Sequence, residues 1–395
     1  MYVRCVENIE ELDPVREAWN ALAAGHPFRA PTWLTTWWQH YGDGQRGREL
    51  RVWLAFSSKL ADPASLQGVL PCYLESTWTQ GRVLRLLGDG EVCSDHLGLV
   101  AASESACAVA ETFARRLAEV DEWDLLDFAA VDSDDAATHA LGESLALDDC
   151  TVSRLQADRC WVIDLPSTWD DFLAMQSKSH RKQLRQMTAR VLESDRARWQ
   201  LAESPNEFAT PWSTLVELHQ RRRKSLGEPG CFASPRWAAF HWDVAQHLLD
   251  EDSLRLSTLE LDGRAIAAEY HLAGARTTYA YQGGVDPDRL HDEPGQLSTI
   301  CSIKRAIDEG HTRFDFLRGD EPYKAHWRAT PRQAVRLVAV PPRMWPKLRR
   351  GAWTGLSDAT RLARFLGGRG SGRAVHRVPA SGSAGASPSH QNVGK

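Results

Sequence analysis

The most distinctive run of chemically useful residues is Arg313–Trp327, with the sequence RFDFLRGDEPYKAHW. Its first half alternates like a strand, so that Phe314 and Phe316 point one way and Asp315 the other. A carboxylate set among aromatic side chains needs a partner or has a raised pKa. Gly319 interrupts the strand, and polar residues follow at its end, where α/β proteins commonly place their sites: Asp320, Glu321, Tyr323 and Lys324.

These side chains suit proton transfer. A carboxylate could act as a base and the tyrosine as a proton donor. The candidate catalytic residues of this segment are therefore Asp315, Asp320, Tyr323 and Lys324. The alternative is a salt-bridged corner, for example between Asp320 and Lys324.

Glu269, in the sequence AIAAEYHLAG, is a further candidate base. It is a single acid in an otherwise apolar strand, and its neighbours lie on the opposite face: Ile266, Ala268, Tyr270 and Leu272. Such an acid is either a general base facing a cleft or an edge residue facing water.

The junction at residues 293–298 could bind phosphate. It follows a strand and a loop and opens a helix, whose N-terminus offers unpaired N–H groups and the positive end of the dipole. We expect these residues to bind a cofactor: Pro294, Gly295, Gln296, Leu297 and Ser298. The alternative is an ordinary Pro/Gly helix start. The segment lacks the G-K-[ST] of a P-loop.

Two basic segments could bind an anionic substrate or the phosphates of a cofactor. One opens the predicted helix 178–192, and the other ends the predicted helix 212–225. The candidate residues are Lys178, Arg181, Arg185 and Arg222. A solvated helix face explains the same charges.

Metal and hydrolase chemistry have little support in the sequence. The eight cysteines are scattered and form no C-x-x-C pair, so we expect free thiols and no metal. No H-E-x-x-H and no defensible Ser-His-Asp order occurs. The 16 tryptophans could line a cleft, but large core residues are the simpler interpretation.

The elements that must position these residues follow an order that occurs twice. In the second half, strands are predicted at 254–261, 265–272 and 277–283, a helix at 296–309 and a strand at 311–317. Asp262-Gly263 predicts a hairpin turn and Gly310 a helix C-cap. In the first half, strands are predicted at 51–57, 68–74, 83–87 and 96–100, a helix at 103–120 and a strand at 123–130.

This repeated order predicts an α/β fold with a mixed sheet, built as two tandem lobes. We expect an N-terminal lobe at 1–160 and a C-terminal lobe at 161–340, which includes a helical region at 168–250 with helices at 169–175, 178–192, 212–225 and 234–249. A basic amphipathic segment at 341–366 and a disordered tail at 367–395 complete the chain.

The totals limit the classes of function. The length of 395 residues suits two lobes, and the net charge of −5 argues against a DNA-binding protein. We find no secretory signal and no membrane-spanning stretch, and expect a cytoplasmic protein. The segment 341–366 could contact a membrane surface peripherally, or pack as a terminal helix on its own protein.

Together these segments resemble the GNAT-like acetyltransferase domain of the CelD/BcsL cellulose-biosynthesis acetyltransferases, distant relatives of the Fem-type transferases. The matching segments are FRAPTWLTTWW at 28–38, LRLLGDG at 84–90, SKSHRKQLR at 177–185, LHQRR near Leu218, GCF at 230–232 and FDFLRGDEPYKAHW at 314–327. The junction at 293–298 departs from the usual Gln/Arg-x-x-Gly-x-Gly/Ala loop, since it holds one glycine.

The resemblance implies two GNAT-like lobes and direct transfer from an acyl-CoA, with acetyl-CoA as the first choice, to an amine or hydroxyl. A saccharide acceptor linked to envelope polysaccharide fits the family context. In this mechanism a backbone N–H of the middle strand polarises the thioester, Glu269 or Asp320 is the base, Tyr323 protonates the thiolate and Lys324 orients a carboxylate or phosphate. The alternatives are a Fem-type aminoacyl-tRNA-dependent transferase and a non-catalytic scaffold in polysaccharide assembly.

Overall fold

The computed structural model describes residues 1–351 and has the mixed α/β fold that the sequence predicts. By its internal contacts the chain divides into two compact units. The N-terminal unit contains Met1–Cys160, Ala239–Val244 and, among the described residues, 332–351. The C-terminal unit contains Trp161–Ala238 and Ala245–Pro331. The predicted disordered tail and the end of the basic segment lie outside the described residues.

The N-terminal unit is built on a mixed sheet in which the strands follow the spatial order β1-β2-β3-β4-β6-β13. The strands are β1 (Tyr2–Val6), β2 (Arg48–Phe56), β3 (Leu66–Thr77), β4 (Gly81–Leu86), β5 (Val100–Ala101), β6 (Leu125–Asp132) and β13 (Thr330–Val340). The helices are α1 (Arg16–Leu22), α2 (Pro31–Tyr41), α3 (Ala106–Glu119) and α4 (Ala136–Leu147), with 3-10 turns η1 (Ile9–Val15), η2 (Pro27–Arg29), η3 (Pro63–Ser65) and η4 (Gly90–Val92). Strand β7 (Thr151–Asp164) passes from this unit into the next after Cys160.

The helix α3 makes the crossover of this unit. It connects β4 to β6, which pair in parallel through Val83 with Leu125 and Leu84 with Leu126. Its apolar face is buried through Val109, Phe113 and Leu117. Trp19, Trp33, Trp37 and Trp123 are fully buried, so these tryptophans are core residues.

The predicted strand at 96–100 is wrong over most of its length, because only Val100–Ala101 forms a strand. His96 has a φ of 58°, outside the β region. Its Nδ1 lies 2.7 Å from Asp132 Oδ1, and Leu97 donates its N–H to the carbonyl of Ala130. These local bonds replace a strand ladder.

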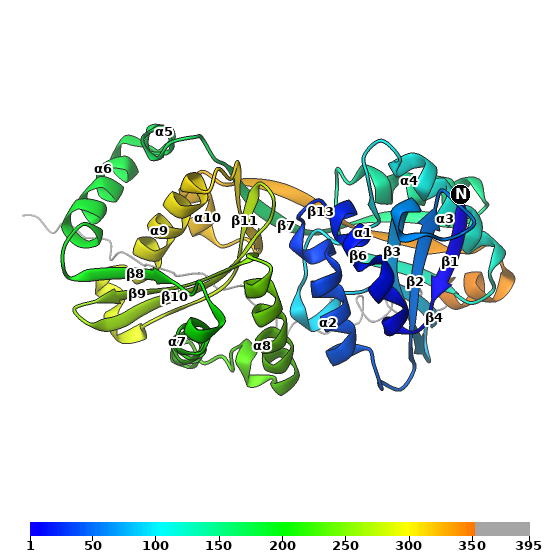
Figure 1. Ribbon diagram of the computed structural model, residues 1–395, viewed down its shortest axis with the longest axis horizontal. Coiled ribbons are helices and arrows are strands. Elements are labelled where there is room, and N and C mark those ends of the chain that lie inside the picture. The colour runs from blue at the N-terminus through cyan, green and yellow to red at the C-terminus, as the bar shows by residue number, and fades with distance from the viewer. Residues whose placement is uncertain (352–395) are drawn as a thin grey trace, which may run out of the picture. The chain divides into compact units, whose positions relative to one another are not determined.

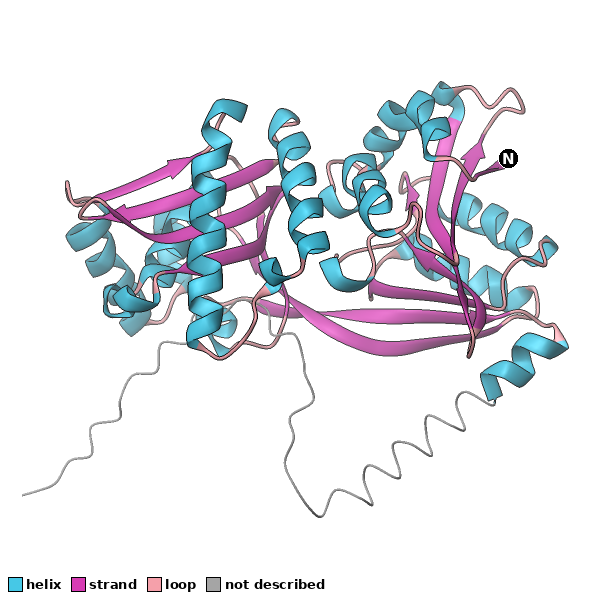
Figure 2. Cartoon of the chain, turned by 90° about the horizontal axis from the view of Figure 1, so that it is seen from below, coloured by secondary structure: helices cyan, strands magenta, loops and turns pink. Residues whose placement is uncertain are grey.

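The C-terminal unit repeats the same succession on a sheet in the order β12-β11-β10-β9-β8. Its strands are β8 (Ala197–Leu201), β9 (Leu254–Leu261), β10 (Arg264–Ala273), β11 (Thr277–Val285) and β12 (Arg313–Arg318). Its helices are α5 (Trp169–Met175), α6 (Lys178–Met187), α7 (Pro205–Ser225), α8 (Pro235–Asp250), α9 (Pro294–Asp308) and α10 (Pro322–His326), with short helical turns η5 (Thr188–Leu192), η6 (Cys231–Ala233) and η7 (Pro287–Asp292). Figures 1 and 2 show α9 and α7 on opposite faces of this sheet.

Local signals set these elements as the sequence predicts. Asp262 and Gly263 have φ values of 54° and 74°, which confirms the hairpin turn. Gly310 has a φ of 75° and ends α9, with the N–H of His311 bonded to the carbonyl of Ala306. Helix α7 begins at Pro205, earlier than predicted, with this proline in the first turn after the N-cap Ser204. Phe208 and Trp212 stack within it, with ring centroids 5.3 Å apart.

The described part of the basic segment packs on its own unit. Arg343 lies 3.0 Å from Asp121, and Arg349 lies 2.9 Å from Asp124. Among residues 1–351, none of the helices is both long enough and apolar enough to cross a bilayer.

Candidate active site

The parallel strands β11 and β12 of the C-terminal unit pair only at their beginnings. Their register runs from Thr277 with Arg313 to Tyr279 with Asp315. Along its other edge β11 pairs with β10 from Thr278 to Val285, and the register shifts so that Tyr270 faces Gln282 while His271 faces Ala280. Tyr281 is therefore the extra residue of a β-bulge. An opening at the carboxyl ends of parallel strands, next to a bulge, is a common place for a site.

Glu269 on β10 is held from two sides. Its Oε1 accepts a hydrogen bond of 2.6 Å from the hydroxyl of Ser298 on α9, and its Oε2 lies 3.4 Å from Nε2 of His271. The carboxylate faces α9 and is 16% exposed. On β11, Gly283 stands opposite, and a Cβ there would lie 2.3 Å from Oε2, so this glycine leaves room for the carboxylate.

The start of α9 separates the five predicted cofactor residues into two groups. Pro294, Leu297 and Ser298 are buried, and the hydroxyl of Ser298 donates its hydrogen bond to Glu269. Gly295 and Gln296 are partly exposed at the first turn. The N–H of Gln296 is bonded to the carbonyl of Glu293 at 3.0 Å, so of these two residues Gly295 is the one that offers its N–H at the positive end of the helix dipole.

Glu293 and Gln183 border this helix start. Glu293 has a φ of 54° and occupies the N-cap position. The side-chain amide of Gln183 on α6 donates to Gln296 Oε1 at 3.3 Å and to Glu293 Oε2 at 3.5 Å. Helix α6 therefore lies against the beginning of α9.

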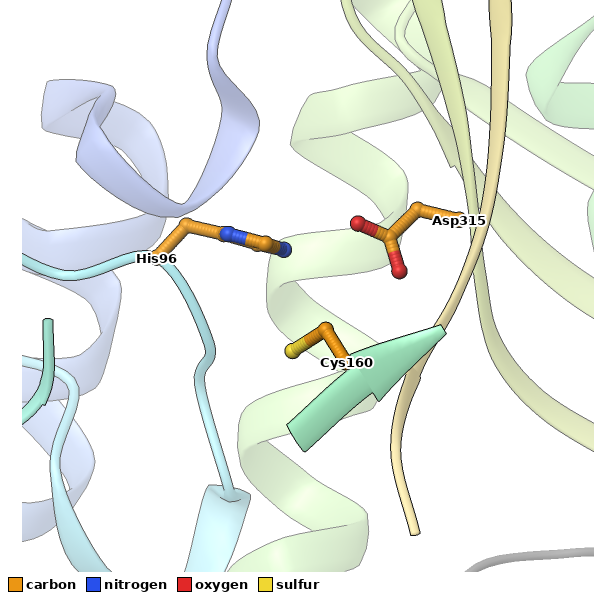
Figure 3. Close-up of side chains that lie close together, drawn as sticks. All are labelled: His96, Cys160 and Asp315. Atoms are coloured by element: carbon orange, nitrogen blue, oxygen red, sulfur yellow. The ribbon is translucent and has the colours of Figure 1, made fainter. Parts of the chain in front are cut away.

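The end of β12 forms a corner. Asp315, drawn as sticks in Figure 3, is buried. Its Oδ1 accepts the N–H of Leu317 at 2.7 Å. Leu317 and Gly319 then turn the chain with φ values of 57° and 111°. Asp320 is exposed and accepts a hydrogen bond of 3.1 Å from the indole N–H of Trp161.

Lys324 is the buried centre of this corner, with 1% of its side chain exposed. Its Nζ donates to the carbonyl oxygens of Leu317, Arg318 and Gly319 at 3.2, 2.8 and 3.1 Å. Its acidic partner is Glu321 at 3.0 Å, which takes the place expected of Asp320. Lys324 is therefore fully engaged in positioning the backbone after β12.

Tyr323 packs edge-on against Phe316, with ring centroids 5.7 Å apart. Burial raises the pKa of its hydroxyl above the ordinary value, and the negative charges of Glu321 and Glu269 raise it further. The hydroxyl is therefore protonated throughout the neutral pH range.

The predicted basic residues lie on two different helices. Lys178, Arg181 and Arg185 are on α6, on the α9 side of the sheet, whereas Arg222 is on α7, on the other face. With Lys182, the cations of α6 fall within an arc of about 100° on the helix. Within residues 1–351 no acidic side chain pairs with any of these five cations.

His271 was missed by the sequence reasoning. It stands two residues after Glu269, so the strand period puts both side chains on one face. That spacing was the available signal. Figure 3 also labels His96 and Cys160, which belong to the N-terminal unit.

Comparison with known proteins bears on the fold and the general activity of this region. Residues 178–325 match the family model described as an acetyltransferase (GNAT) domain. The match spans α6 to α10 and includes every candidate residue above. It supports acyl transfer as the general activity of this region. The curated proteins contain no match to the chain.

Solved structures share the fold over most of the chain. FemX superimposes with a TM-score of 0.58 at 12% identity, covering 85% of this chain and 97% of FemX. The C-terminal domain of a putative lysylphosphatidylglycerol synthetase from Agrobacterium fabrum gives 0.51 at 12% identity, covering 90% and 97%. L-PGS from Bacillus licheniformis gives 0.50 at 13% identity, covering 85% and 95%. At these identities the likeness concerns the fold.

Proposed function

We propose that the chain is an acyl-CoA-dependent acyltransferase, with acetyl-CoA as the first-choice donor and an amine or hydroxyl acceptor. The observation that carries the proposal is the separation of β11 from β12 after Tyr279, with α9 starting at the same edge. A candidate base, Glu269, and a candidate proton donor, Tyr323, both belong to this unit. Acyl-CoA is a cytoplasmic metabolite, and we propose that location for the reaction.

The donor's phosphates would bind at the start of α9. Gly295 presents its backbone N–H at the positive end of the helix, whereas the N–H of Gln296 is bonded to the carbonyl of Glu293 at 3.0 Å. Helix α6 contacts this start through Gln183, and at 100° per residue its cations lie on the side of the helix away from Gln183. The N–H of Gly295 favours an anionic ligand. The carboxylate of Glu293 opposes it.

The chemistry needs three protein groups. The backbone N–H of Tyr281, out of register at the bulge, would polarise the thioester carbonyl. Glu269 would take the proton of the acceptor, and Tyr323 would give a proton to the leaving thiolate. We assign Asp315 and Lys324 to positioning the corner that carries Tyr323, and Asp320 to the exposed rim. Direct attack of the acceptor on the thioester is the simplest route.

A Fem-type aminoacyl-tRNA-dependent transferase is the second candidate. It is favoured by the row of cations on α6, which no acidic side chain neutralises within residues 1–351, because such rows suit a polyanionic phosphate backbone. For the acceptor, the resemblance to CelD/BcsL proteins favours a saccharide, with a small-molecule amine as the alternative.

Calorimetric titration with acetyl-CoA tests the proposal. We expect binding at about micromolar strength that Gly295→Glu abolishes, because the new carboxylate faces the phosphates. Lys59→Glu, on the other unit, controls for added negative charge. Failure of acetyl-CoA and longer acyl-CoAs to bind would sink the proposal. Binding of aminoacyl-tRNA would then support the second candidate, and its absence a scaffold.

A further inference from the structure

A cysteine and a histidine on the α7 side of the sheet form a pair that has no role in the proposed reaction. Cys231 begins η6, in the connection between α7 and α8. Its Sγ lies 3.3 Å from Nε2 of His219 on α7. The two residues come from the segments LHQRR at 218–222 and GCF at 230–232.

The protonation of His219 is set by its other ring nitrogen. Nδ1 lies 3.0 Å from the carbonyl oxygen of Gly283 on β11. A carbonyl oxygen only accepts, so Nδ1 carries the proton and Nε2 keeps its lone pair. Nε2 faces the backbone N–H of Cys231 at 3.4 Å as well as its Sγ. Covalent catalysis typically uses a nucleophile, a base within hydrogen-bond reach of it, and a group that orients the base. Cys231, His219 and the carbonyl of Gly283 have this arrangement.

Two glycines of β11 make this pair possible. A Cβ on Gly284 would lie 2.4 Å from the backbone nitrogen of His219, so only glycine lets α7 come this close. Gly283 supplies the carbonyl that orients His219. In the pairing of β11 with β10, Gly283 stands opposite Glu269. The close approach therefore brings the imidazole to the stretch of β11 that pairs with Glu269, on the face of the sheet opposite the carboxylate.

The thiol also lies beside the bulge. The side-chain amide of Gln282 donates to Sγ of Cys231 at 3.4 Å. Gln282 directly follows Tyr281, whose backbone N–H we propose as the group that polarises the acyl carbonyl. Sγ therefore contacts the side chain of the residue that follows the bulge, on the α7 face of the sheet.

The resting pair is neutral. Burial raises the pKa of the Cys231 thiol to about 12 and lowers that of His219 to about 4. The thiol is therefore not a preformed thiolate, and it needs Nε2 to take its proton as the new bond forms.

We propose that Cys231 accepts the acyl group from the donor and that His219 is its general base. This deepens the proposed function, on which it rests for the class of donor, and it replaces direct attack by two displacements. Sγ attacks the thioester carbonyl while Nε2 takes the thiol proton. The C–S bond to the donor breaks, the proton passes to the leaving thiolate, and a Cys231 thioester remains. The acceptor's nitrogen or oxygen then attacks this thioester while Glu269 takes the acceptor's proton. The bond from the carbonyl carbon to Sγ breaks, and the proton passes from Glu269 through solvent to the Sγ thiolate.

The test uses the full chain without acceptor. The protein is incubated with acetyl-CoA or with the small thioester acetyl-N-acetylcysteamine, quenched in acid and mapped by mass spectrometry. We expect one acetyl group on Cys231 and exchange of labelled CoA into acetyl-CoA, which requires a covalent intermediate. Cys231→Ala and His219→Gln should each lower labelling and exchange by at least about 100-fold.

Cys301→Ala is the matched control. Cys301 lies on α9 of the same unit, and burial raises its pKa to about 12 as well. Within residues 1–351 its thiol has no histidine partner, so labelling should be unchanged. Thermal midpoints check the fold of each variant, and Cys231→Ser is a second, smaller change.

The outcomes separate this inference from the proposed function. An unlabelled Cys231 with both thioesters, or full turnover by Cys231→Ala or Cys231→Ser, overturns the inference. Calorimetric binding of acetyl-CoA in the same samples would leave the proposed function standing. Labelling by the small thioester without binding of acetyl-CoA would support the nucleophile and remove the CoA donor.

Discussion

Glu269 combines partial burial with two polar neighbours of different kinds. The hydroxyl of Ser298 fixes one oxygen, and His271 lies 3.4 Å from the other. Because Gly283 leaves space beside Oε2, the carboxylate has room for an acceptor's proton as well. Glu269→Gln should therefore lower kcat by about 100-fold or more while leaving the affinity for acyl-CoA unchanged, since glutamine keeps the shape but cannot take a proton.

Glu260→Gln is the control for this change, because Glu260 is an acid of the neighbouring strand β9. Its activity should match that of the unchanged protein in a steady-state acyl-transfer assay. A Glu269→Gln variant that keeps full kcat would remove Glu269 from the role of base.

Glu293 is the residue that most directly opposes phosphate binding. It is exposed at the N-cap of α9, where a negative charge repels an anionic ligand placed at the helix start. Glu293→Gln should tighten acetyl-CoA binding by about 2- to 5-fold, the effect of one charge at a helix terminus. Calorimetry at low and high salt measures this, and the gain should shrink as salt screens it. An equal affinity at low salt would place the phosphates elsewhere.

At the scale of elements, the turn after β12 depends on Lys324 more than on any acid. Lys324→Met should cost about 3 kcal/mol of unfolding free energy, because three carbonyls lose their donor and Glu321 is left without its cation. Denaturant unfolding measures the cost. Lys182→Met, an exposed and unpaired lysine on α6, should change it little. Similar free energies of unfolding for the two variants would show that the corner holds without Lys324.

The elements of the C-terminal unit were predictable where the apolar periodicity of a segment agrees with the turn or cap residues at its ends. The hairpin β9–β10 follows from Asp262-Gly263 between alternating strands, and α9 from its apolar face and Gly310. The turn at His96 was not predictable, because its φ of 58° depends on Asp132, distant in sequence. Strand β13 was missed as well, since a sequence gives no sign that Ala334–Ala339 pairs with β6 across two hundred residues.

The candidate site divides in the same way. Glu269, Asp315 and Tyr323 could be chosen from the sequence because each is a polar residue in an apolar setting. The partners of Lys324 could not, since Glu321 and Asp320 are equally close in sequence. The pairing of Cys231 with His219 could not either, because it depends on how closely Gly284 lets α7 approach β11.

At the scale of the whole molecule, one buried acid should make stability depend on pH. Asp89 of the N-terminal unit accepts a hydrogen bond from Tyr73 at 2.8 Å, and its side chain is 11% exposed. Burial raises the pKa of its carboxyl from 3.8 to about 6. Arg85 offsets this only in part, because it lies 3.8 Å from Asp89 but 3.0 Å from Asp127.

The folded chain therefore holds the Asp89 proton more tightly than the unfolded chain, and this contribution to stability is lost as the pH rises from about 4 to 6. Asp89→Asn should equal the unchanged protein in unfolding free energy near pH 4 and exceed it by up to about 3 kcal/mol at pH 7.5. Unfolding by denaturant at both pH values measures the difference, with the exposed Asp148→Asn as control. A constant difference between Asp89→Asn and the unchanged protein across this range would mean that Asp89 is already ionised in the fold, held by Arg85 strongly enough to cancel its burial.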